Sequence, residues 1–176
     1  KQDEEREKNW QIYVSIYNKY VQFYHEELLK NEQASIARDY LKKRNLSKEE
    51  VKKFKIGYVE KNPKFYEKLI KDFNEKDLVE SGLFYLDEKN KSYVEKFKER
   101  IIFPINNISG QPIGLGGRII KENNYMAKYI NSPETKFFKK GSNLYNLDFV
   151  RKLSNKIDYI YLVEGYMDVV GLSKNG

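Results

Sequence analysis

The sequence predicts an α+β fold in which a helical N-terminal part is followed by a mixed or antiparallel sheet. Over the first third of the chain, large apolar residues recur every three or four positions, which is the period of an amphipathic helix. Beyond residue 82, short apolar runs alternate with turn-forming clusters, which is typical of strands joined by hairpins. Helices that precede strands in this way favour an α+β domain.

A long amphipathic helix is expected first. Its buried stripe is predicted to consist of Trp10, Tyr13, Val14, Tyr17, Tyr20, Val21, Tyr24 and Leu28. A second helix is expected over residues 35–44. Ser47 and Glu50 form a capping box at the start of a third helix. Asn62 and Pro63 supply the N-cap and the first position of a fourth.

The centre of the sheet is predicted to be a hairpin of residues 100–105 and 112–120. Its second strand contains three glycines, Gly114, Gly116 and Gly117. Glycines weaken a strand, so they predict the close approach of another element or of a ligand. Near the end of the chain, the apolar residues 157–163 predict a buried strand that leads through Gly165 into a helix.

The composition argues against several kinds of chemistry. Because the chain has no cysteine, it can hold no disulfide, iron–sulfur cluster or zinc ribbon. His25 is the single histidine, which disfavours a Ser-His-Asp triad or a multi-histidine metal site. A metal ion would have to be bound by carboxylates, which favours Mg²⁺ or Mn²⁺ over zinc. No apolar run reaches the ~18 residues of a membrane span, and the charged first residues are unlike a signal peptide, so a soluble, cytoplasmic protein is expected.

Positive charge is concentrated in one stretch of the chain. The formal net charge is +7, which suits nucleic acid, an anionic membrane or an acidic protein as a partner. Residues 111–152 contain three acidic residues against eight basic ones, namely Arg118, Lys121, Lys128, Lys136, Lys139, Lys140, Arg151 and Lys152. An electrostatic footprint for nucleic acid requires such a local concentration.

Two carboxylates follow the last predicted strand. Glu164 stands at its end, beside a glycine that allows a sharp turn, and Asp168 falls in the first turn of the next helix. Ligands bind at this end of the strands in α/β units, so the pair could share a cation. The alternative is that both acids only complement the dipole of the helix.

Five segments, in order, resemble bacterial DnaG-type DNA primases. Residues 163–169 read VEGYMDV, which looks like the glutamate motif of a TOPRIM domain in its primase form. The others are YLKKR at 40–44, FKIGY at 54–58, RIIFPI at 100–105 with GLGGR at 114–118, and KYINSPET at 128–135 followed by FKKG and LY. The chain departs from the family at Asn45, Leu115 and Asn146, which replace glycine, phenylalanine and glycine. Asparagine tolerates positive φ best among residues other than glycine.

The resemblance implies an enzyme, a nucleotidyltransferase that makes short RNA primers on DNA. Its partners would be a single-stranded DNA template, ribonucleoside triphosphates and the RNA primer, with the replicative helicase bound through parts outside this chain, and no membrane. Its cofactor would be Mg²⁺ or Mn²⁺, and zinc is expected only in an N-terminal domain before Lys1. The DxD metal motif of the family is expected beyond Gly176, so this chain by itself is expected to be an inactive piece of a larger enzyme.

The resemblance also assigns roles to residues. Glu164 and Asp168 match the acidic catalytic and metal-binding positions. The positions matching nucleic-acid or nucleotide contacts are Arg44, Arg100, Arg118, Lys128, Tyr129, Asn131 and Lys140. Arg118, Lys128 and Lys140 are expected to converge on one groove, with the glycines before Arg118 letting the strand approach the nucleic acid. Lys121, Lys136 and Lys139 are expected to be diffuse background charge.

Three parts are expected along the chain. Residues 1–33 would form the amphipathic helix, residues 34–154 the N-terminal subdomain of a primase core, and residues 155–176 the first strand and helix start of a TOPRIM α/β domain. Two other functions remain open. The chain could be a single-stranded nucleic-acid-binding module, or belong to another TOPRIM protein such as a topoisomerase or nuclease. Residues 128–147 argue against the last, because only primases are expected to carry that segment.

Overall fold

The structure, a computed structural model, describes residues 1–121, 125–153 and 157–175, and confirms the α+β class. Its helices are α1 (Gln2–Lys30), α2 (Ser35–Lys43), α3 (Lys48–Lys53), α4 (Phe65–Leu69), α5 (Glu75–Glu80), α6 (Leu147–Leu153) and α7 (Tyr166–Leu172). Its strands are β1 (Gly57–Val59), β2 (Phe84–Asp87), β3 (Ser92–Glu95), β4 (Arg100–Asn106), β5 (Pro112–Ile119) and β6 (Tyr129–Asn131). The expected boundary between residues 154 and 155 lies outside the described residues.

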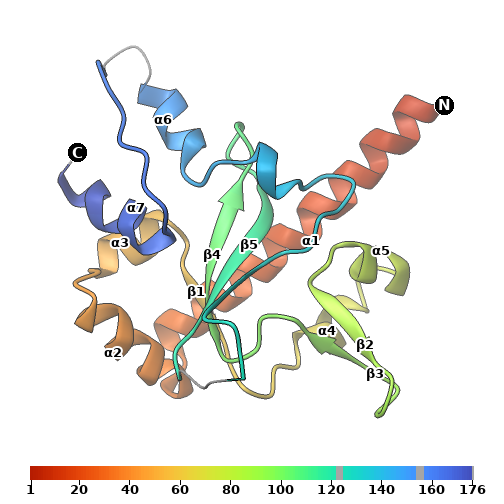
Figure 1. Ribbon diagram of the computed structural model, residues 1–176. Helices are drawn as coiled ribbons and strands as arrows, with labels where there is room; N and C mark the ends of the chain where they lie inside the picture. Colours follow the sequence, from red (N-terminus) through yellow and green to blue (C-terminus); the bar gives the residue numbers. More distant parts are fainter. Residues whose placement is uncertain (122–124, 154–156, 176) are drawn as a thin grey trace.

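The central sheet has the order β1-β4-β5-β6, and all its ladders are antiparallel. β4 and β5 form the expected hairpin, while β2 and β3 form a separate one. Figure 1 shows α1 crossing the central sheet, α2, α3 and α7 together on one side of it, and the small hairpin with α4 and α5 on the other. Tyr58, Ile101, Arg118 and Tyr129 stand in one register row across the four strands. Residues paired in this way point to the same face of a sheet.

The aromatic stripe of α1 packs on one face of the sheet, as the helical period predicted, except that Trp10 is only partly buried. Tyr17, Tyr20 and Tyr24 are almost completely buried there, together with Ile102 of β4. The hydroxyl group of a buried tyrosine usually has a hydrogen-bond partner. The hydroxyl of Tyr17 accordingly donates to the Ser81 carbonyl at 2.9 Å. This face is the main core of the chain.

The other face of the sheet is covered by α2, α3 and α7. Ile101 and Phe103 of β4 point into it, and they pack with Leu41 of α2, Val51 of α3 and Val170 of α7. The turns that place these helices contain two asparagines with positive φ, at residue 45 (58°) and residue 146 (70°). The tolerance of asparagine at glycine positions is thereby confirmed.

The predicted start of the fourth helix is wrong. Its N-cap is Lys64, and the helix begins at Phe65 rather than at Pro63. The backbone N–H of Phe65 donates instead to a carboxylate oxygen of Glu95 at 2.9 Å. The buried Glu95 side chain of β3 thus accepts a hydrogen bond from a backbone N–H group in the first turn of the helix. A side chain of a neighbouring residue is therefore not needed as the cap.

The glycines of β5 do admit close neighbours, but these are aromatic rings of the same chain. A Cβ on Gly114 would overlap the Phe138 ring, and one on Gly117 would overlap Phe97. Gly116 lies directly beneath the ring of Tyr166. The expectation that this glycine run lets nucleic acid approach the strand is therefore wrong, since the space is already filled.

Residues 157–163 do not form the predicted buried strand. They run as extended chain without ladder hydrogen bonds to any described strand, and Tyr159, Tyr161 and Leu162 are more than 70% exposed. A strand is stable only where a neighbour takes up its N–H and C=O groups, and none of the described strands lies beside this segment. The helix after Gly165 does form, as α7.

Candidate nucleic-acid interface and acidic site

Arg118 lies between two tyrosine rings on the α7 side of the sheet. Its guanidinium carbon is 4.9 Å from the centroid of Tyr129 and 5.2 Å from that of Tyr40. One guanidinium nitrogen also donates to the Tyr129 hydroxyl at 2.6 Å. Arginine stacks on aromatic faces in this way because its planar cation meets the negative face of the ring. Because Arg118 is only 5% exposed, its guanidinium group contacts the Tyr129 ring rather than solvent.

Tyr40 connects Arg118 with Arg44. The guanidinium carbon of Arg44 lies 5.5 Å from the centroid of the Tyr40 ring, and Arg44 itself is exposed at the end of α2. Tyr40 belongs to the YLKKR motif, but the sequence assigned it no contact of its own. Its place one helical turn before Arg44 was the available signal for this role, because side chains four residues apart meet on a helix.

Asn131 and Tyr166 join this cluster to α7. The Tyr166 hydroxyl donates to the side-chain oxygen of Asn131, and the Tyr166 ring lies 6.3 Å from that of Tyr129. Burial, together with the neighbouring Tyr129, raises the pKa of Tyr166 to about 12. The structure therefore brings Arg44, Arg118, Tyr129 and Asn131 together, and fixes the start of α7 beside them.

Arg100 takes a different place. It is 3% exposed and donates to the backbone carbonyls of Ala127 (2.9 Å), Gly117 (3.3 Å) and Lys128 (3.3 Å). Burial lowers its pKa. The position fits a residue that ties the end of β5 to the approach to β6. Direct contact of Arg100 with nucleic acid stays a prediction that its burial does not favour.

Lys128 and Lys140 are both exposed, and of the two Lys128 is the one that lies at the Arg118 end of β5, because it directly precedes β6. Lys140 follows Phe138, whose ring packs on Gly114 toward the other end. Gly114 and Arg118 are separated by about 13 Å of strand at 3.3 Å per residue. The cations are thus spread along β5 because the chain between them runs beside that strand.

Glu164 and Asp168 are both exposed at the start of α7, and neither points into a dry core. The Asp168 carboxylate turns back toward Gly165. Carboxylate oxygens are donors that suit Mg²⁺ or Mn²⁺. Among the described residues, however, no group of three or more His, Cys, Asp or Glu side chains could hold a metal ion. The two acids fit part of such a site.

This α+β chain stacks arginines on tyrosines at one face of its sheet, and it has exposed lysines along β5 and two exposed acids at the start of α7. Proteins of this class are suited to binding phosphates and bases. Comparison with known proteins gives the family. The chain belongs to the family "DNA primase catalytic core, N-terminal domain", whose model matches residues 23–151.

A curated relative and two solved structures illustrate the similarity. The DNA primase of Escherichia coli strain K12 is 37% identical over 158 residues, covering 87% of this chain and 26% of the relative. The DnaG primase catalytic domain bound to ssDNA has a TM-score of 0.79 at 34% identity, covering 94% of this chain and 51% of that one. The RNA polymerase domain of Mycobacterium tuberculosis primase DnaG, in complex with double-stranded DNA, has a TM-score of 0.86 at 26% identity, covering 94% and 52%.

The chain therefore spans about a quarter of the length of the curated relative, and about half of each solved chain. Within the described part of the chain, no helix combines the length and the apolar character that crossing a membrane requires.

Proposed function

We propose that this chain supplies part of the template-binding surface of a DNA primase, an enzyme that makes short RNA primers on single-stranded DNA. The face that carries Arg118 supports this best. Arg44 beside this face and Lys128 and Lys140 along β5 are exposed cations that suit the phosphates of a strand, and the Tyr129 ring suits a base. The solved relative bound to ssDNA supports the choice of ligand.

Arg118, Tyr40 and Asn131 act in this proposal as positioning residues. The Arg118 guanidinium fixes the Tyr129 ring through a stacking contact and a hydrogen bond. The Tyr40 ring stacks against the guanidinium groups of both Arg118 and Arg44. Asn131, which accepts from Tyr166, keeps the acidic start of α7 beside the proposed path of the strand. Rings and guanidinium groups held in advance lose less entropy when a strand binds.

The proposed chemistry is metal-dependent nucleotidyl transfer by the whole protein. Bound Mg²⁺ or Mn²⁺ would polarise the α-phosphate of a ribonucleoside triphosphate and neutralise the leaving pyrophosphate. Glu164 and Asp168 would hold such an ion through their carboxylate oxygens. Water, the phosphates of the substrate and ligands outside the described residues would fill the other positions of the ion. We expect this chain to bind DNA without synthesising primers.

The test is the binding of a labelled single-stranded oligonucleotide, followed by fluorescence anisotropy over a salt series. Affinity should fall steeply with salt, by roughly 0.7 in log–log slope for each phosphate neutralised. The double variant K128A/K140A should bind more weakly and with a smaller slope. Lys121→Ala is the matched control, because Lys121 lies among Glu60 and Glu99 and its charge is locally balanced. Equal losses in both variants would show that the positive charge acts diffusely and would contradict the proposal.

A further inference from the structure

We propose that a lysine-rimmed cavity, separate from the template-binding surface, binds a nucleotide with its base inside and its phosphate at the rim. The cavity has a volume of about 230 Å³ and opens between the end of α3, the β4–β5 turn and the start of α6. The residues that matter to its chemistry are Lys53, Lys55, Lys152, Phe149, Tyr145 and Asp148. None of them belongs to the predicted nucleic-acid contacts, so the inference does not depend on the proposed function.

The rim carries unbalanced positive charge. Lys53, Lys55 and Lys152 are exposed, and no ion pair joins any of them to a carboxylate among the described residues. Two of the ammonium groups lie against one ring, with the Nζ atoms of Lys53 and Lys152 at 5.3 and 5.2 Å from the centroid of Phe149. Ammonium groups gathered in this way repel one another, and a phosphate between them relieves that repulsion.

The single acid of the cavity lies inside rather than at the rim. Asp148 is 4% exposed, and one of its oxygens accepts from the Asn106 amide at 3.2 Å. A buried carboxylate repels a phosphate but accepts hydrogen bonds from the amino or imino groups of a base. The distribution of charge thus sets an orientation, with the phosphate outward and the base inward.

Two residues that line the cavity also bury polar atoms that the chain itself leaves unsatisfied. The Tyr145 hydroxyl and the side-chain oxygen of Asn146 are buried without a hydrogen-bond partner among the described residues. Burial raises the pKa of Tyr145, as do Tyr166 and Asp148, so its hydroxyl stays protonated and able to donate. Unsatisfied buried groups of this kind cost stability unless a ligand or water reaches them.

The remaining wall suits a flat, apolar ring. It consists of Phe54, Phe149, Pro104 and Pro112, with Val21 of α1 behind them. Base–aromatic stacking stabilises bound nucleotides without demanding a particular base. The cavity is smaller than the ~300–1,000 Å³ of drug-sized sites, so it holds the base while sugar and phosphate lie at the opening.

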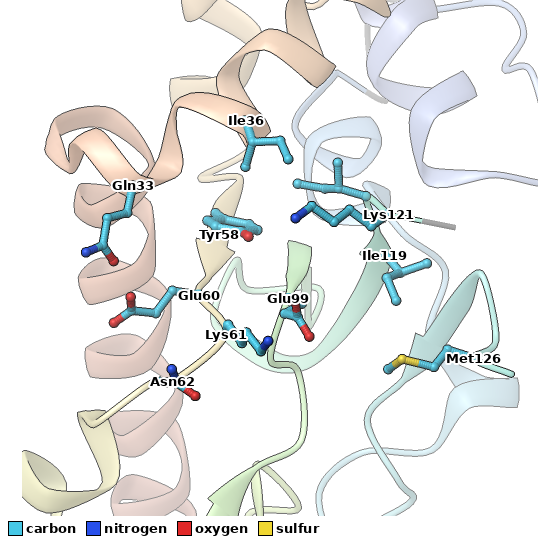
Figure 2. Close-up of a pocket in the computed structure, with 11 residues that line it drawn as sticks. Gln33, Ile36, Tyr58, Glu60, Lys61, Asn62, Glu99, Ile119, Lys121 and Met126 are labelled. Carbon is cyan, nitrogen blue, oxygen red and sulfur yellow. The ribbon is translucent and has the colours of Figure 1, made fainter. Parts of the chain in front are cut away.

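A second hollow provides an internal contrast. Figure 2 shows this pocket, of about 380 Å³, with Tyr58 in its middle and charged side chains around it. There Lys61 and Lys121 are matched by Glu60 and Glu99, so the charges balance. The larger pocket therefore offers no excess of positive charge to a phosphate, whereas the smaller one does.

The test is the binding of ATP to the full chain by isothermal titration calorimetry, with variants on both parts of the cavity. The double variant K53A/K152A should weaken ATP binding about tenfold, because it removes two charge-assisted contacts. Lys52→Ala, an exposed lysine of α3 that does not line the cavity, should leave it unchanged. ATP affinity unchanged in K53A/K152A would overturn the site.

The variant Tyr145→Phe should fold normally, because it removes only the hydroxyl group. It should weaken ATP binding while the melting temperature holds or rises, since an unsatisfied buried group is lost. A loss of melting temperature without a change in ATP affinity would contradict the proposal. Inorganic triphosphate, which has no base, should bind more weakly than ATP, and equal binding would contradict an inward base.

The same nucleotide chemistry could come from a free nucleotide or from the end of a strand. Titration of K53A/K152A with a 5′-phosphorylated oligonucleotide separates the two sources. If ATP binding falls and the oligonucleotide binds as before, the ligand is a free nucleotide. If both fall, the cavity also takes the end of a strand. If only the oligonucleotide responds, the site belongs to a longer basic surface and the nucleotide proposal fails.

Discussion

The two faces of the central sheet use the same residue type for different purposes. On the α1 face, tyrosines are completely buried, and Tyr17 and Tyr24 give their hydroxyls to Ser81 and Glu95. On the α7 face, Tyr40 and Tyr129 lie against the guanidinium of Arg118. The tyrosines of the α1 face pack in the core, while those of the α7 face hold arginine side chains near the surface.

The difference shows that aromatic content alone does not mark a functional site. The α7 face differs in the group that lies beside each tyrosine ring, which is an arginine side chain. A tyrosine beside a backbone carbonyl is held for packing, whereas a tyrosine beside an arginine can share its face with a base. The comparison therefore predicts that changes on the α1 face alter stability, and that matched changes on the α7 face alter binding.

The largest effect is expected from Tyr20→Ala on the α1 face. The Tyr20 ring is fully buried and lies 4.7 Å from Tyr24 and about 6 Å from Phe65 and Phe84. Removing a buried aromatic ring should lower the free energy of unfolding by about 3–5 kcal/mol. Urea denaturation measures this, with Tyr20→Phe as the control that keeps the ring. A loss below about 1 kcal/mol would break the assignment of this face to the core.

A smaller effect on the same face depends on pH. Burial raises the pKa of Glu95 above its usual range, although Tyr24 and the Phe65 N–H donate to the carboxylate. A raised carboxyl pKa means that folding favours the protonated form. Its stability contribution is complete below the usual pKa of about 4.3 and is lost as pH rises through the higher folded value.

In the wild type, the free energy of unfolding should therefore decrease as pH rises above the usual carboxyl pKa. In Glu95→Gln this decrease should be smaller, because the titrating group is absent. Melting temperatures of both proteins from pH 4 to pH 8 measure it. All other carboxyls are common to the two proteins, so the difference isolates Glu95. Parallel curves for wild type and Glu95→Gln would contradict the role given to burial.

The smallest effect is expected from Tyr40→Leu on the α7 face, and it should appear in binding. Leucine keeps an apolar side chain at this position but removes the ring against which Arg44 and Arg118 stack. A cation–π contact is worth about 1 kcal/mol, so affinity for single-stranded DNA should fall roughly fivefold. Tyr40→Phe should restore it, because the Tyr40 hydroxyl has no hydrogen-bond partner in the described part of the chain. If Phe and Leu bind alike, the ring does not position the arginines.

The sequence predicted well wherever the cause was local. The period of the α1 stripe, the Ser47–Glu50 capping box and the β4–β5 hairpin depend on residues close together in the chain, and all are present. The cationic stretch from 111 to 152 likewise contains the exposed lysines of the proposed interface. The order of the five motifs along the chain was enough to predict the family.

The errors arise from contacts between distant residues. Glu95 caps α4 across 30 residues, and the ring of Tyr166 fills the space over Gly116. Arg100 was expected to contact nucleic acid, yet it is buried and donates to three backbone carbonyls from elsewhere in the chain. Neither local spacing nor composition contains that information, because tertiary packing decides which side chain faces which neighbour.

The most direct test of the central claim is to map single-stranded DNA onto the chain by ¹H–¹⁵N NMR during a titration at low salt. We expect amide shifts to gather at the end of α2, at Lys128–Asn131 and near Lys140, while the amides in the middle of α1 stay unchanged. Shifts concentrated along α1, or spread evenly over exposed lysines, would contradict the assignment of one face to the fold and the other to the template.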